Sequence, residues 1–136
     1  MLPSGIGSDS VTHFLPLFYP DIINNISHFA VENVRSARRF LIKAGIQTKI
    51  DDLNFHLLNK HSSAADISKI LEIVNSGNKL GVLSEAGMPG IADPGSLLVK
   101  KAHEKNIRVI PVTGPSSIFL ALAASGMNGQ NFAFNG

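Results

Sequence analysis

The feature that most constrains the fold is an alternation of short strand-like runs with longer helical runs. The strand-like runs recur at intervals of roughly 25 residues, which is the spacing of strand–helix units in a parallel sheet. They lie at residues 28–32, 54–59, 80–84, 108–112 and 132–134. The pattern therefore predicts an α/β fold with a five-stranded, mostly parallel sheet and helices on both faces.

Two of the intervening helices carry signals of their own. The first helix is expected to end at Gly45. The second is expected to start at Ser63 and Asp66, which have the spacing of a capping box, and to end at Gly77. The apolar residues that share a face are Val34, Ala37, Leu41 and Ala44 in the first helix and Ile67, Ile70, Leu71 and Val74 in the second.

Two further helices are expected to begin at Pro94 and Pro115, because the fixed φ of proline suits the first helical position and its missing N–H costs nothing there. Residues 115–125 are small and apolar on nearly every face, so this helix is expected to be buried.

The composition fits one globular domain covering residues 1–136, with 44% hydrophobic and 16% charged residues. A net charge of +2 does not by itself argue for nucleic acid. Cysteine is absent, which excludes disulfides and thiolate metal sites and makes a reducing cytoplasm the expected location. The longest apolar run, residues 118–124, is far below the roughly 20 residues that span a bilayer.

Three loops have the position and composition of a ligand site. In a doubly wound parallel sheet, ligands bind outside the carboxyl ends of the strands. The loops there are residues 4–8, 84–95 and 113–117, and the middle one carries glycines and prolines that let a backbone approach a ligand along a stiff path. The alternatives are an elaborate structural connection for the middle loop and simple helix capping for the last.

Other chemistries find no support in the sequence. Gly5 and Gly7 lack the third glycine of a dinucleotide fingerprint, and no phosphate-binding Gly-Lys-Ser/Thr is present. The five histidines show no metal-ligand spacing, so no metal site is expected.

The loop motifs resemble the tetrapyrrole (corrin/porphyrin) methylase superfamily. Residues 83–89 read Leu-Ser-Glu-Ala-Gly-Met-Pro, residues 92–95 Ala-Asp-Pro-Gly, and residues 109–117 Val-Ile-Pro-Val-Thr-Gly-Pro-Ser-Ser. The chain looks most like the branch that methylates a cytidine 2′-hydroxyl in small-subunit ribosomal RNA, since residues 32–35 (Glu-Asn-Val-Arg) and 59–62 (Asn-Lys-His-Ser) resemble that branch's segments. Glu85, Met88 and Asn33 replace the Asp, Thr and Asp that are usual there, so donor binding is better supported than the acceptor.

The resemblance implies S-adenosylmethionine as cofactor, bound between this N-terminal domain and a second, C-terminal domain that the chain does not contain. Residues 1–3 are interpreted as the end of a strand, and the chain as part of a longer protein. The partners implied are that second domain and ribosomal RNA or a tetrapyrrole, with no membrane, and a homodimer is compatible with the resemblance. The alternatives to an RNA methyltransferase are a tetrapyrrole methyltransferase and a non-catalytic α/β binding module.

The resemblance also assigns roles to residues. Glu32 and Arg35 are the candidate catalytic residues, although a charged residue at a strand end is as readily a solvated one, and Arg35, Arg38 and Arg39 are candidates for phosphate contacts. The acceptor is expected near Pro3, Gly5, Gly7, Lys60 and His61. The cofactor is expected to contact Ser84, Glu85, Ala86, Gly87, Met88, Pro89, Asp93, Gly114, Pro115, Ser116 and Ser117.

Overall fold

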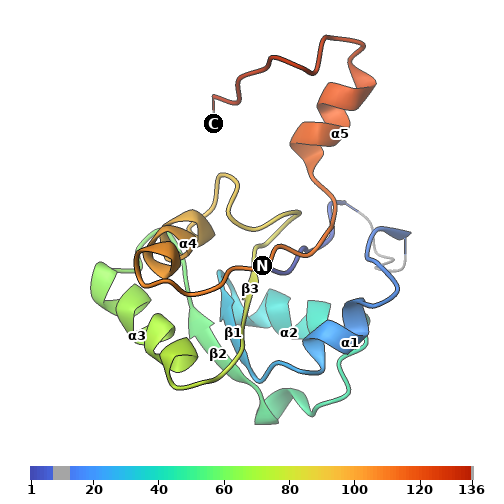
Figure 1. Cartoon of the computed structure of the whole chain (residues 1–136). Helices are drawn as coiled ribbons and strands as arrows, with labels where there is room; N and C mark the ends of the chain where they lie inside the picture. Colours follow the sequence, from blue (N-terminus) through green and yellow to red (C-terminus); the bar gives the residue numbers. More distant parts are fainter. Residues whose placement is uncertain (8–12, 136) are drawn as a thin grey trace.

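The computed structural model describes residues 1–7 and 13–135, and within them one parallel sheet lies between helices (Figure 1). Its strands are β1 (His28–Val31), β2 (Asn54–Leu57) and β3 (Leu80–Leu83), in the order β2-β1-β3. The central strand β1 is buried from Phe29 to Val31, because a parallel strand between two neighbours is covered on both faces. The predicted α/β class and parallel sheet are confirmed.

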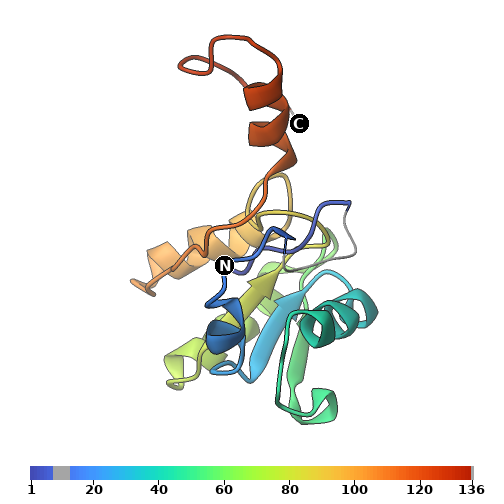
Figure 2. The same ribbon diagram turned by 90° about the vertical axis from the view of Figure 1, so that its right-hand side faces the viewer.

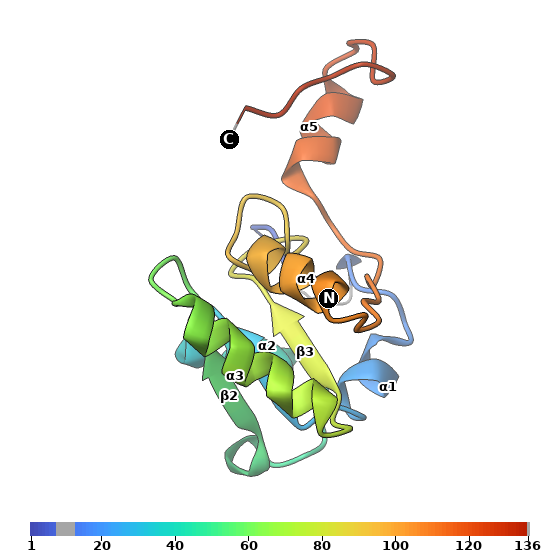
Figure 3. The same ribbon diagram turned by 60° about the vertical axis from the view of Figure 1, so that its left-hand side comes forward.

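Helices cover both faces of the sheet, as predicted (Figures 1 and 3). One side carries α1 (Tyr19–Ile23) and α2 (Val34–Lys43), and the other carries α3 (Ala64–Asn75) and α4 (Gly95–Glu104). Successive side chains of a strand point to opposite faces. Phe29 and Val31 therefore join the core beneath α1 and α2, whereas Ala30 joins the core beneath α3 and α4.

The helix starts follow the signals in the sequence. Ser63 and Asp66 form the predicted capping box, and the hydrogen bonds from Ser63 hold the pKa of Asp66 below its usual value. In α2 the Asn33 side chain accepts from the backbone N–H groups of the first turn. α4 begins directly after Pro94, and a short 3₁₀ turn, η2 (Ile50–Asp52), precedes β2.

The prediction of five strands was wrong, since the sheet has three and residues 108–112 and 132–134 form no strand. Residues 1 and 2 lie between β3 and residues 110–112. Leu2 N–H donates to the Val82 carbonyl at 2.8 Å, Val112 N–H donates to the Met1 carbonyl at 3.0 Å, and Leu2 forms an isolated parallel bridge with Leu83. Two residues are too few to carry a continuous ladder from β3 to residues 108–112.

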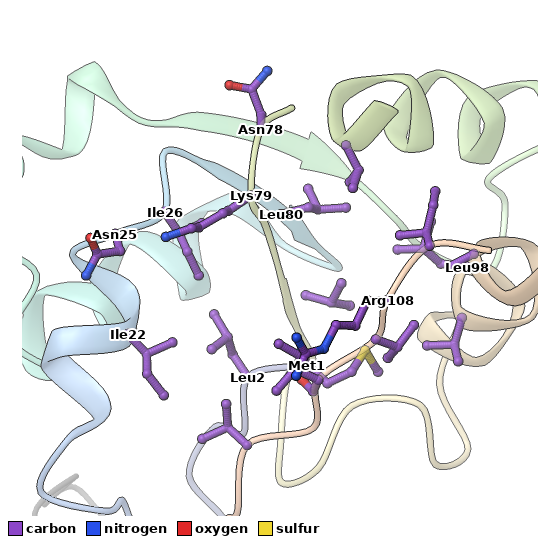
Figure 4. Close-up of a pocket in the computed structure, with 18 of the residues that line it drawn as sticks. Met1, Leu2, Ile22, Asn25, Ile26, Asn78, Lys79, Leu80, Leu98 and Arg108 are labelled. Carbon is purple, nitrogen blue, oxygen red and sulfur yellow. The ribbon is translucent and has the colours of Figure 1, made fainter. Parts of the chain in front are cut away.

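Next to Met1 and Leu2 an apolar groove of about 590 Å³ separates β3 from the segment that follows α4 (Figure 4). Leu80 and Leu98 are among the side chains that line it. Because side chains and not a backbone strand border this space, residues 108 and 109 have no ladder partner on that side. The groove thus gives the physical reason for the shorter sheet.

The last helix, α5 (Ser117–Ala124), differs from the prediction in its start and in its burial. Ser116 precedes it in an extended conformation, so the helix begins two residues after Pro115. Phe119 and Leu120 are 54% and 57% exposed, because α5 projects away from the sheet and its helices (Figures 1 and 2). Among the residues that the structure describes, no helix is both long and apolar enough to cross a membrane.

Candidate functional site

The carboxyl ends of β1 and β3 bring two glutamates together. Val31 and Leu83 are register partners, so the residues that follow them leave the sheet at the same edge. Glu32 Oε1 accepts a hydrogen bond from the backbone N–H of Glu85 at 3.1 Å, and Ser36 Oγ donates to Glu85 Oε2 at 3.2 Å. Glu32 is therefore tied to the loop after β3, and Glu85 is tied to the first turn of α2.

The loop after β3 is held together by Asp93. Both of its carboxylate oxygens accept from the Gly90 N–H at 2.8 Å, and Oδ1 also accepts from the Gly95 N–H at 2.7 Å. Ser84 Oγ donates to the carbonyls of Ala86 and Gly87, both at 3.2 Å. These bonds hold the loop together through its own residues.

Three loops meet at Gly87. Its φ of +69° lies in the left-handed region that favours glycine, and a Cβ there would be 3.2 Å from the Pro115 carbonyl and 3.3 Å from Ile6 Cγ2. The Gly87 carbonyl accepts from the Ser4 N–H at 2.9 Å. The first loop, the loop after β3 and the turn before α5 therefore lie side by side at the carboxyl edge of the sheet.

Gly114, in the turn before α5, also lies at the junction of the three loops. A Cβ on Gly114 would overlap the ring of Pro3 and would lie 3.5 Å from Met88 Sδ. The backbone of the turn before α5 can approach the first loop this closely only because residue 114 has no side chain.

A cavity of about 600 Å³ opens between the first loop and α2. Its polar lining has both signs of charge, with Glu32 and Glu85 from the strand ends and Arg39 and Lys43 from α2. Its remaining walls include Ser4, Gly5, Gly7, Phe14, Ser36 and Phe40. Ser4 and Ser84 line the cavity and also donate hydrogen bonds to the Gly87 carbonyl, so the cavity and the three-loop junction form one continuous region.

Ser4 is the buried polar side chain of this region. It is 4% exposed, and within the described residues its Oγ has no hydrogen-bond partner. The buried hydroxyl of Tyr19 donates to the carbonyl of Pro3, the residue before Ser4, at 2.8 Å, and burial raises the pKa of this phenol. Tyr19 therefore fixes the backbone at the base of the first loop.

The structure gathers most of the residues that were predicted for the cofactor, without testing that role. The segments 84–90 and 113–117 adjoin one another, whereas Asp93 uses its carboxylate inside its own loop and Ser116 and Ser117 start α5.

The residues predicted for the acceptor divide into two groups. Gly5 and Gly7 line the cavity, and Pro3 packs against Gly114. Lys60 and His61 follow the edge strand β2, are exposed, and do not line it. Ser8, the last residue of the first loop, lies outside the described residues.

The arginines also separate. Arg39 lines the cavity, whereas Arg38 pairs with Asp51 and Arg35 does not line the cavity. Sequence reasoning included Ser4 only as part of the first loop, with no role of its own, and missed Ser36. A weak signal existed for Ser36, which stands near Glu32 at the start of α2, but none indicated the burial of Ser4. Residues 1–7 and 13–135 hold no cluster of three or more side chains suited to a metal ion.

Fold and site together define an α/β domain whose loops gather at the carboxyl edge of a parallel sheet, the edge at which doubly wound folds bind their ligands. The chain belongs to the family of Tetrapyrrole (Corrin/Porphyrin) Methylases, whose sequence profile matches residues 22–133. The resemblance found in the loop motifs is confirmed by this match.

Similar proteins in bacteria carry the name Ribosomal RNA small subunit methyltransferase I. That of Xylella fastidiosa is 36% identical over 115 residues, which is 85% of this chain and 40% of the relative. That of Buchnera aphidicola from Acyrthosiphon pisum is 29% identical over the whole chain and 45% of the relative, and that of Vibrio cholerae is 30% identical over 85% of the chain and 38% of the relative. The chain thus spans less than half the length of these relatives.

Proposed function

We propose that the whole protein to which this chain belongs transfers a methyl group from S-adenosylmethionine to a ribose 2′-hydroxyl of small-subunit ribosomal RNA. The observation that carries the proposal is the junction of three loops at Gly87 next to a cavity that holds Glu32 and Glu85. The names of the relatives and the family support the reaction class.

The residues at the junction fit the donor. Ala86, Gly87 and Gly114 offer a wall of small residues along which an adenosyl group can contact the backbone, and the exposed Thr113 and Ser117 add hydroxyl groups. Glu85 places a carboxylate beside this wall, which favours a cationic sulfonium. S-adenosylmethionine would supply an electrophilic methyl group there.

Glu32 is the proposed proton acceptor. One of its carboxylate oxygens is held by the Glu85 N–H, which orients the side chain at the mouth of the cavity. When the ribose oxygen bonds to the methyl carbon, the bond from that carbon to sulfur breaks, its electron pair stays on the resulting thioether, and the hydroxyl proton passes to Glu32. The main contribution of the chain is alignment, because in-line displacement depends on holding both reactants in the attack geometry.

Arg39 favours an RNA acceptor. Arg39 lines the cavity from α2, together with the two glutamates from the strand ends, and its guanidinium can neutralise a phosphate adjoining the reactive ribose. We place the remaining wall of the cleft, and a C-terminal domain, in the additional length that the relatives have. A cytoplasmic location, where ribosomal subunits are found, belongs to the same proposal.

The test supplies the whole protein with labelled S-adenosylmethionine and either small ribosomal subunits or a precorrin-type tetrapyrrole. We expect label on the RNA, removed by ribonuclease, and a Glu32→Gln variant that labels RNA about 10²-fold or more slowly, the usual scale of acid–base catalysis. Label on the macrocycle with none on RNA would replace the proposed acceptor. A Glu72→Gln variant serves as control, because Glu72 is exposed on α3 and outside the cavity.

A further inference from the structure

We propose that the apolar groove beside Met1 and Leu2 takes a further β-strand, an extended apolar segment of the same polypeptide that runs into Met1 and pairs with β3 on one side and with residues 108–110 on the other. The proposal stands on the backbone around the groove and does not depend on the proposed function. Neither the family match nor the names of the relatives says what fills this space.

Met1 and Leu2 already bond as residues of an inner strand do. Leu2 N–H donates to the Val82 carbonyl, on the β3 side, at 2.8 Å. On the other side, the Met1 amino group donates to the Ile110 carbonyl at 2.9 Å, and the Met1 carbonyl accepts from Val112 N–H at 3.0 Å. Consecutive residues thus bond to opposite neighbours, which is the pattern of a strand that has a parallel partner on each side.

The two neighbours have further backbone groups that face the groove. The N–H and C=O of a strand residue point to the same side, and that side alternates along the strand. Because the Val82 carbonyl faces Leu2, Val82 N–H and the Leu80 carbonyl point the same way, away from β1. By the same alternation, Ile110 N–H and the Arg108 carbonyl face the groove from its other side. Within residues 1–7 and 13–135, no backbone hydrogen bond outside the sheet ladder uses any of these four groups.

The side walls of the groove suit a strand that is covered on both faces. Ile22 and Ile26 reach the groove from α1 and the turn after it, and Leu98 reaches it from α4 (Figure 4). A parallel strand between two such layers is apolar along its whole length. An alkyl chain can contact the same walls, but it would leave the backbone groups unpaired, and burying an unpaired polar group is costly. Walls and backbone groups together therefore favour a polypeptide strand.

The amino group of Met1 stands where a strand would have an amide. Burial lowers the pKa of this amino group below its usual 8.0, because the charged form loses contact with water. An amide N–H in the same place would donate to the Ile110 carbonyl without placing a charge beside the apolar groove. A residue joined to Met1 would therefore remove an electrostatic cost and extend the ladder.

The register of the incoming strand follows from the parallel bridge between Leu2 and Leu83. The residue joined to Met1 would stand opposite Gly81, and the one before it opposite Leu80, where β3 begins. An extension of three residues is therefore long enough to reach past the start of β3.

The experiment joins two such extensions to Met1 and compares them with the unextended chain. Ile-Val-Ile can pair with both neighbours. Ile-Pro-Pro has the same length and is also apolar, but its two residues nearest Met1 have no N–H, and their rings stand where ladder hydrogen bonds would form. It is therefore a matched control for apolar cover without a strand.

Hydrogen exchange at the amides of Val82 and Ile110 gives the direct measurement. Ile-Val-Ile should slow exchange at both amides by about tenfold or more, because each N–H gains a partner. The slowing should exceed any change at Phe29, which lies in the central strand with a neighbour on each side. Ile-Pro-Pro should leave both amides at the rates of the unextended chain.

Three results would overturn the proposal. Unchanged exchange with Ile-Val-Ile would show that no strand enters the groove. Equal slowing by both extensions would show that the groove takes any apolar chain. If exchange at both amides in the unextended chain slows as its concentration rises, with a dimer seen in sedimentation, the occupant is a second copy.

Discussion

The hydroxyl of Tyr19 donates to the carbonyl of Pro3 at 2.8 Å in a fully buried setting, and so α1 anchors the loop that forms one wall of the candidate site. Both partners lie away from solvent, so neither can exchange the bond for water. The position of Ser4, the next residue along the chain, depends on this contact.

Tyr19→Phe removes the donor and leaves the Pro3 carbonyl buried without it. We expect the free energy of unfolding to fall by about 1–3 kcal/mol, measured by urea denaturation. Phe18→Leu changes the exposed neighbouring aromatic residue and should stay within about 0.5 kcal/mol of the parent. Equal stabilities for Tyr19→Phe and the parent would show that the bond has no net effect.

Gly87→Ala should abolish most donor binding. The new Cβ would press on the Pro115 carbonyl and Ile6, and alanine would have to adopt a left-handed conformation that costs about 1–2 kcal/mol. Gly77→Ala imposes the same backbone strain at φ +88°, with nothing within 4 Å of the added atom. Calorimetry with S-adenosylmethionine on the whole protein should show weakened binding for Gly87→Ala alone. Equal affinities in the two variants would remove Gly87 from the donor site.

Stability should fall as the pH drops below neutrality. His28 Nδ1 lies 3.1 Å from His56 Nε2, and burial together with the nearby His28 lowers the pKa of His56 below its usual 6.5. The unfolded chain therefore takes up a proton on His56 first, so the contribution is present above pH 6.5 and is lost as the pH falls through the lower pKa of the folded state. Urea denaturation at about pH 7.5 and about pH 5.5 should show a smaller decline for His56→Gln than for the parent. An identical decline in both would exclude this pair as its source.

RNA binding by the whole protein should depend on salt, and Arg39 should account for part of that dependence. Arg39→Ala removes one phosphate contact, so the slope of log affinity against log salt should become shallower by about one. Arg38→Ala is a matched control on the same helix, because Arg38 pairs with Asp51 and does not line the cavity. A slope that changes equally in both variants would indicate a diffuse charge effect in place of a phosphate site.

Features encoded in short segments could be predicted from the sequence. The predicted box of Ser63 and Asp66 is decided by residues within one helical turn, and α3 starts there; the cap at Asn33 is equally local. Because loops that follow parallel strands leave the sheet at the same edge, the sequence also predicted a candidate site at the carboxyl edge of the sheet.

Features that depend on distant parts of the chain could not be predicted. The strand expected at residues 108–112 needed a long backbone partner, and within the described residues its backbone hydrogen bonds join it to Met1 alone. Burial of α5 was expected from its apolar residues, but Phe119 and Leu120 stay more than half exposed, although the ring of Phe119 meets that of Phe132 edge to face. The burial of Ser4 depends on Gly87, which is remote in sequence.

The junction at Gly87 also has a consequence for the order of folding. Its three loops come from the beginning, the middle and the last quarter of the chain, so contacts of long sequence separation must close before it exists, and such contacts form slowly. During synthesis the proposed donor site cannot assemble until residues 113–117 have left the ribosome. A chain made only as far as α4 would thus lack one of the three loops of the proposed donor site.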